Sequence, residues 1–179
     1  TLKNALSIYP EDRVLLRILA GQYFEAALYS ESQGLYSELV ELDSGDVSAW
    51  IKLAEIAAFR QHYSSAISYH RHILQLDSGN MNSLMQMGEI LERQKDKDAV
   101  IYYKKAYELY PENQKAAYAL ANWYVRKDKP ERVIPICYSI LKMDSTNIRF
   151  HKLAGYSHHK MDQINPSIHH FKQAIELGD

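Results

Sequence analysis

The chain has 179 residues, of which only seven are Gly and five are Pro, while 46% are hydrophobic and 24% are charged. So few turn-forming residues exclude a disordered or linker-rich protein and argue against many short strands. The apolar fraction is large enough to build a core, and the composition therefore predicts an all-α protein. No apolar run approaches the roughly 20 residues that cross a bilayer, so no membrane span is expected.

The net charge of −1 conceals two halves of opposite charge. Residues 1–90 carry 6 Lys and Arg against 11 Asp and Glu, whereas residues 91–179 carry 15 against 11. A protein that binds duplex nucleic acid is normally basic overall, with its cations clustered in one stripe. The composition therefore argues against nucleic-acid binding and indicates an acidic first half and a basic second half.

A repeated pattern runs through the chain, and five segments share it. They start at residues 32, 66, 99, 133 and 167, spaced by 34, 33, 34 and 34 residues. Each predicts an amphipathic helix, and a second helix is predicted in front of each one. In that preceding helix a large residue, an adjacent large-small pair and another large residue share one face. The small residue lets the paired helix approach closely, so the pattern predicts packed helix pairs.

This pattern resembles the tetratricopeptide repeat family, whose signature is W-x2-L-G-x2-Y followed by A-x3-F, A and P. Residues 50–57, WIKLAEIA, match the first part, and residues 99–111, AVIYYKKAYELYP, match the second. The resemblance implies an α-solenoid, a right-handed superhelix of antiparallel helix pairs. It also implies that the first helix of each pair lines a concave groove, in which a peptide or a partner helix binds.

The resemblance predicts one array of about five repeats over residues 1–179, with a leading half repeat. The predicted repeats are 13–46, 47–80, 81–113, 114–147 and 148–179, and residues 1–12 match the tail of a preceding second helix. The third repeat is one residue short in its internal turn, around residues 95–97. The last helix has an apolar face, with Phe171 and Ile175, although terminal repeats normally present a polar face. We therefore expect a fragment of a longer array, or ends that pair with another chain.

Candidate binding residues lie on the first helices of the basic half and point away from the buried stripe. They are Lys115, Tyr118, Asn122, Arg126, Arg149, Lys152 and Tyr156. Cations, amides and phenols of this kind bind peptide amides and carboxylates, so we expect a protein or peptide partner of acidic character. The alternative is that they form ordinary solvent-exposed helix faces. One family variant holds a terminal carboxylate with a Lys and an Asn four residues apart, and no first helix here has that pair.

The eight histidines show no metal-binding spacing. The adjacent pairs 158–159 and 169–170 point about 100° apart on a helix, and His151 and His158 lie two turns apart. Neither His-Glu-x-x-His nor a Cys/His spacing occurs. His70, His151 and His158 occupy core positions of the repeat, where buried neutral rings are expected; clustered titration near pH 6 is the alternative. We predict no metal and no cofactor.

The sequence has no motif that supports catalysis. A Gly-rich phosphate loop and a Gly-x-Ser-x-Gly segment are both missing, and the single cysteine, Cys137, falls on a packing face. Pro135 lies inside a predicted helix and should bend it or remove a backbone hydrogen bond. We therefore predict a non-catalytic protein-interaction scaffold. The alternatives are a structural spacer that self-associates through Phe171 and Ile175, or a regulatory domain attached to an enzyme outside this sequence.

Overall fold

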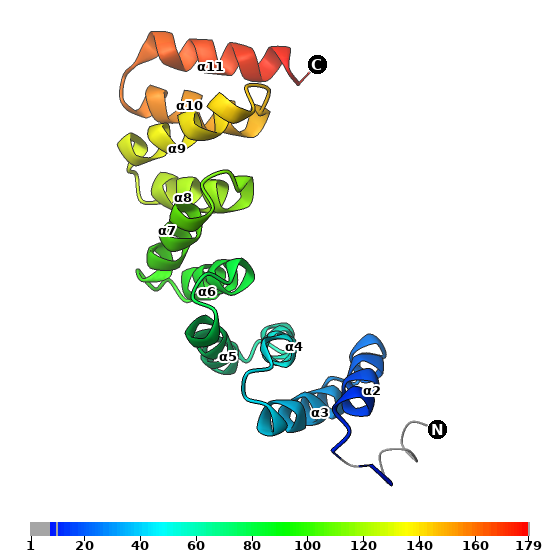
Figure 1. The fold of residues 1–179 in the computed structure, drawn as a ribbon. Helices are drawn as coiled ribbons and strands as arrows, with labels where there is room; N and C mark the ends of the chain where they lie inside the picture. The colour runs from blue at the N-terminus through cyan, green and yellow to red at the C-terminus, as the bar shows by residue number, and fades with distance from the viewer. Residues whose placement is uncertain (1–7, 10, 179) are drawn as a thin grey trace. The chain divides into compact units, whose positions relative to one another are not determined.

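The described residues of the computed structural model are 8–9 and 11–178, and they form ten α-helices and no strand (Figure 1). The prediction of an all-α fold is confirmed, while the predicted helix tail in residues 2–12 lies largely outside the described residues. The helices are α2 (Arg13–Glu25), α3 (Tyr29–Leu42), α4 (Val47–Phe59), α5 (Tyr63–Leu76), α6 (Met81–Arg93), α7 (Ala99–Leu109), α8 (Gln114–Arg126), α9 (Pro130–Met143), α10 (Ile148–Lys160) and α11 (Ile164–Glu176).

The helices belong to two compact units, residues 1–90 and residues 91–179. These units coincide with the acidic and basic halves of the sequence, and we call them the acidic unit and the basic unit. Within each unit, helices that follow one another in the chain pack against each other, from α2 to α5 and from α7 to α11. None of the helices in the described part of the chain is both long enough and apolar enough to cross a membrane.

An Asp or Asn begins every even-numbered helix, which is the first helix of a pair. These residues are Asp12, Asp46, Asn80, Asn113 and Asn147, spaced by 34, 34, 33 and 34. Each side-chain oxygen accepts from a backbone N–H two or three residues later, at 2.9 to 3.4 Å. The first N–H groups of a helix have no intrahelical partner, and such a cap stabilises a helix by about 1 kcal/mol. The repeat therefore carries its own helix-start signal.

The turn within each pair contains one residue in the left-handed region. These are Ala27, Gln61, Lys95, Asp128 and Asp162, with φ between 51° and 60°. Lys95 follows Gln61 by the full 34 residues, yet α7 begins only at Ala99. The missing residue of the third repeat therefore falls between Lys95 and Ala99, in the turn where the sequence placed it.

The small residues of the first helices lie where the second helices approach closely. Ala20 and Gly155 are buried at equivalent positions, and the backbone carbonyl of each accepts a hydrogen bond of 2.9 Å from a serine twelve residues later, Ser32 or Ser167. A Cβ added at Gly155 would lie 3.0 Å from the ring of Phe171. The predicted role of the small residue in helix pairing is confirmed at both places.

Helix α9 continues through Pro135, which is exposed. Proline has no N–H, so its only necessary effect is the loss of one hydrogen bond along the helix. Cys137, two residues later, is fully buried, as its place on the packing face predicted. Burial raises the pKa of its thiol to about 12, which keeps the thiol protonated.

Candidate functional site

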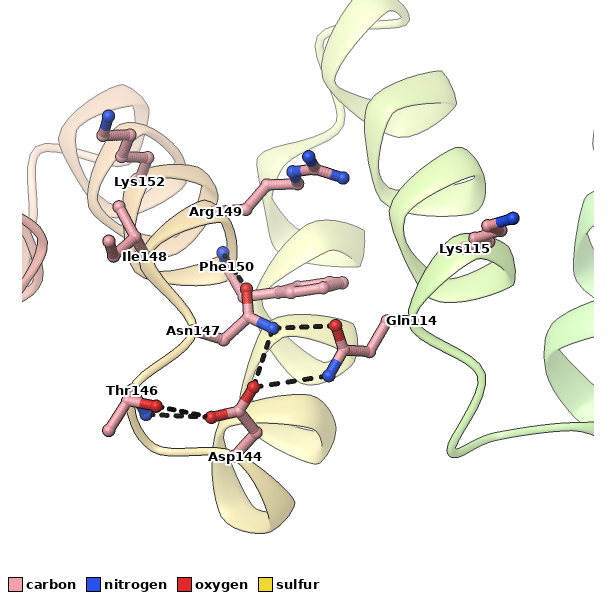
Figure 2. Close-up of a pocket in the computed structure, with 9 residues that line it drawn as sticks. All are labelled: Gln114, Lys115, Asp144, Thr146, Asn147, Ile148, Arg149, Phe150 and Lys152. Atoms are coloured by element: carbon pink, nitrogen blue, oxygen red, sulfur yellow. Dashed lines mark hydrogen bonds between the residues drawn. The ribbon is translucent and has the colours of Figure 1, made fainter. Parts of the chain in front are cut away.

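Three of the seven predicted binding residues line one hollow in the basic unit. Lys115 comes from the start of α8, and Arg149 and Lys152 come from the first turns of α10 (Figure 2). The hollow has a volume of about 740 Å³. Its other lining residues, which the sequence did not single out, are Gln114, Asp144, Thr146, Asn147, Ile148 and Phe150.

A hydrogen-bond network around Asp144 forms one wall of the hollow. The carboxylate accepts from the Thr146 hydroxyl at 2.8 Å, from the Asn147 amide at 3.0 Å and from the Gln114 amide at 3.3 Å. The Asn147 amide also donates to the Gln114 carbonyl at 3.0 Å, which links the start of α10 to the start of α8 (Figure 2). The hydrogen bonds from Thr146, and then from Asn147, hold the pKa of Asp144 below its usual value. Asp144 is therefore ionised at neutral pH and has its own donors.

Arg149 is held in place by aromatic side chains. Its guanidinium carbon lies 4.7 Å from the centre of the Tyr118 ring, which in turn meets the buried Phe150 edge-on at 6.2 Å. A guanidinium over an aromatic face is attracted by the ring and keeps its hydrogen-bond donors free. Tyr118, a predicted binding residue that does not line the hollow, therefore acts as a support for Arg149.

The positive charge of the hollow is not neutralised within the protein. Among the described residues, no carboxylate forms a salt bridge with Lys115, Arg149 or Lys152. The N-terminal ends of α8 and α10 add partial positive charge at the same place. In Figure 2 the two lysines extend to opposite sides, with Arg149 between them. Three cations face one carboxylate, so the hollow favours anionic groups distributed over some length.

The remaining predicted residues lie elsewhere on the basic unit. Arg126 forms an ion pair with Glu92, which also accepts a hydrogen bond of 3.0 Å from Tyr103. Asn122 is half-buried, and Tyr156 is exposed, with the Lys160 ammonium 5.8 Å from its ring centre. None of these three side chains lines the hollow, and their role in binding stays a prediction.

The histidines at core positions are buried as predicted. His70, His151 and His158 are all buried, and burial lowers the pKa of His70 to about 4. His170, which the sequence did not mark as a core residue, is buried as well, while its neighbour His169 is exposed. Within residues 8–9 and 11–178, no group of three or more His, Cys, Asp or Glu side chains is arranged to hold a metal ion.

Comparison with known proteins establishes the family. The family model described as the tetratricopeptide repeat protein 21 C-terminal ARM domain matches residues 40–153, which are 114 of the 179 residues. The chain belongs to this family. The resemblance to tetratricopeptide repeats is thereby confirmed, and the fold is an all-α helical repeat. No curated protein matches the sequence.

Solved structures of tetratricopeptide proteins share the fold at low sequence identity. YrrB, described as a TPR protein with an unusual peptide-binding site, is 16% identical with a TM-score of 0.76, over 99% of this chain and 92% of YrrB. A MamA structure is 16% identical with a TM-score of 0.79, over 94% of this chain and 92% of that chain. MamA from Desulfovibrio magneticus RS-1 is 18% identical with a TM-score of 0.74, over 93% and 94%. These likenesses concern the fold alone.

Proposed function

We propose that this family member is a non-catalytic protein-interaction module, and that it binds an acidic segment of its partner along the hollow between α8 and α10. One observation carries the proposal: Lys115, Arg149 and Lys152 surround an open hollow and have no ion-pair partner among the described residues. Charge-assisted hydrogen bonds from such cations to carboxylates are about twice as strong as neutral ones.

The arrangement of the cations favours an extended segment with several carboxylates over a single bound anion. Lys115 and Lys152 extend away from each other, so one small anion does not reach both (Figure 2). Asp144 is ionised on the wall of the hollow and repels an anion that approaches closely. Carboxylates of the partner therefore bind along the rim, where each meets a different cation, and Arg149, supported by Tyr118, provides the central contact.

The test is fluorescence anisotropy with a labelled nonapeptide rich in Asp and Glu, compared with the same peptide carrying Asn and Gln. Arg149→Glu and Lys152→Glu each weaken binding of the acidic peptide by about tenfold or more, because each replaces a favourable charge contact by a repulsive one. The affinity also falls as salt is raised. Lys172→Glu, at an exposed lysine of α11, is the matched control and leaves the affinity within about twofold. Equal binding of the two peptides, or equal loss in the control, contradicts the proposal.

Self-association through α11 is the second candidate function, and one observation favours it. Phe171 and Ile175 are 39% and 64% exposed, whereas Cys137 and Leu141, at the equivalent positions of α9, are buried where α10 packs. The exposed face is thus of the kind that a further helix covers within the repeats. Light scattering over a range of concentrations tests it: a mass that rises with concentration, and falls to that of a monomer in Ile175→Asp, supports self-association. A monomer at all concentrations refutes it.

A further inference from the structure

Three buried histidines of the basic unit form one continuous row of polar contacts with a tyrosine. His151 and His158 come from α10, His170 from α11 and Tyr138 from α9, and the three histidines are at most 6% exposed. We call these four residues the histidine row. In order, the contacts are Ser145 O to His151 Nε2 at 3.0 Å, His151 Nδ1 to His170 Nδ1 at 3.0 Å, His170 Nε2 to Tyr138 Oη at 3.1 Å, Tyr138 Oη to His158 Nε2 at 3.1 Å and His158 Nδ1 to Gln163 Oε1 at 2.5 Å.

When all three histidines are neutral, the row allows one arrangement of protons. The Ser145 carbonyl only accepts, so His151 carries its proton on Nε2 and accepts at Nδ1 from His170. His170 is then bare at Nε2 and accepts from the Tyr138 hydroxyl, whose oxygen accepts from Nε2 of His158. The Nδ1 atom of His158 is left as an acceptor. The neutral row therefore requires Gln163 to donate through its amide nitrogen.

When Gln163 presents its oxygen instead, the row needs one more proton. Three neutral imidazoles and one phenol supply four N–H and O–H groups, but five contacts then lie between two terminal oxygens that only accept. A fifth proton completes the row, because it makes one of the imidazoles an imidazolium that donates at both nitrogens. The contact of the Gln163 oxygen with His158 Nδ1 has this protonated arrangement.

We propose that the histidine row is a buried binding site for a single proton, and that its occupancy is coupled to the orientation of the Gln163 amide. Gln163 is exposed in the turn between α10 and α11, whereas the three rings are buried. The proton therefore enters at the His158 end of the row. Its binding turns the Gln163 amide from donor to acceptor, in the turn that holds α10 and α11 together.

The surroundings of the row limit it to one proton. The groups whose charge acts on His170 are His151 and His158 from α10 and His169 from α11, and α9 contributes the Tyr138 hydroxyl. Burial, followed by the charges of these histidines, lowers the pKa of His170 to about 4. A second proton would place two like charges on neighbouring rings, which raises the free energy of the doubly charged row. The first proton is thus the only one that binds in the mildly acidic range.

Nuclear magnetic resonance of the full chain with ¹⁵N-labelled histidine tests the proton arrangement directly. At pH 7.5 the chemical shifts should show His170 protonated on Nδ1, and both His151 and His158 protonated on Nε2. As the pH is lowered, the signals of the three residues should shift together with a common midpoint and an uptake of one proton. His170 protonated on Nε2 at pH 7.5, or three independent midpoints, would overturn the proposal.

Gln163→Glu tests the coupling to the amide. A carboxylate only accepts and adds a negative charge, so the variant raises the midpoint of proton uptake by at least about one pH unit at all three histidines. Asn165→Asp places the same charge in the same exposed segment and is the control, with a smaller effect. Tyr138→Phe interrupts the row at a half-exposed side chain, so in that background Gln163→Glu shifts His158 alone. Equal shifts in Gln163→Glu and Asn165→Asp, or shifts that still reach His151 without the tyrosine hydroxyl, contradict the proposal.

Discussion

The acidic and basic units carry different residues at the same position of the repeat. Two residues after the helix cap, the acidic unit has Val14, Ser48 and Asn82, whereas the basic unit has Lys115 and Arg149. The acidic unit does have a cation nearby, Arg17, but that guanidinium pairs with the cap Asp46 and contacts the Ser48 hydroxyl. The comparison teaches that the repeat sets where a side chain lies, and that the pairing of its charge within the unit decides whether it is available to a partner.

Acid should weaken the acidic unit through its single buried histidine. The folded-state pKa of His70, about 4, lies below the usual 6.5, so the unfolded chain binds the proton more readily. The unfolding free energy is therefore highest above pH 6.5, falls as the pH is lowered, and levels off below pH 4. The loss reaches roughly 3 kcal/mol, since each pKa unit corresponds to about 1.4 kcal/mol.

Urea unfolding at pH 7.5, 5.5 and 4.5, followed by circular dichroism, measures this loss. His70→Gln keeps a group able to bond the Ser83 hydroxyl, which lies 3.2 Å from His70, but does not titrate. It should remove the part of the acid sensitivity that belongs to the acidic unit and leave that of the histidine row. An unchanged pH dependence in His70→Gln would show that the acid sensitivity arises elsewhere.

Asp46→Ala should cost about 2 kcal/mol and so separate capping from charge pairing. Asp46 is buried, caps α4 through the Ala49 N–H at 3.0 Å and pairs with Arg17. Burial alone would raise its pKa, but the hydrogen bonds from Arg17, Ser48 and Ala49 outweigh burial and lower it. The substitution removes a cap, worth about 1 kcal/mol, and leaves a half-exposed guanidinium without its partner.

Asp12→Ala and Asn147→Ala are the matched variants for this measurement. Both residues cap a first helix, but neither has an arginine as partner, so each should lose only about 1 kcal/mol in urea unfolding. Equal losses in all three variants would mean that the Arg17 pair contributes nothing to the stability of the acidic unit.

The fold could be predicted from the sequence because each repeat contains its own instructions. The cap, the small residue and the turn recur at a spacing of 33 or 34, so five weak local signals support one another. Lys115, Arg149 and Lys152 could be predicted for the same reason, since their direction follows from helical periodicity. The support of Arg149 by Tyr118 could not, because it depends on the rotamers of two side chains 31 residues apart.

The network around Asp144 and the burial of His170 were also missed. Both depend on contacts between different helices: Gln114 is 30 residues from Asp144, and Tyr138 is 32 residues from His170. The sequence did hold a signal for His170, since it follows His158 by 12 residues, the separation at which Ser32 and Ser167 meet their carbonyl partners. Pair spacings across a repeat therefore predict more than the periodicity of one helix.

Tyr118→Leu should weaken binding of the acidic peptide about three- to fivefold without a comparable loss of stability. The variant removes the ring on which Arg149 rests, an interaction worth roughly 0.5 to 1 kcal/mol, but keeps an apolar side chain beside Phe150. Tyr156→Leu, on the next first helix and away from the hollow, should leave the affinity unchanged. A larger loss in Tyr156→Leu than in Tyr118→Leu would move the binding surface toward the C-terminal end of α10.

Ala27→Gly should stabilise the acidic unit by up to about 1 kcal/mol. Ala27 has a φ of 58°, where the Cβ of an L-residue costs roughly 1 to 2 kcal/mol, partly offset by the greater entropy of glycine in the unfolded chain. Asp128, at the same turn position in the basic unit, tolerates this conformation better because Asp side chains bond locally, so Asp128→Gly should gain less. Urea unfolding with unchanged m-values distinguishes the two. A gain in Asp128→Gly that equals the gain in Ala27→Gly would show that the turn, and not its side chain, sets the strain.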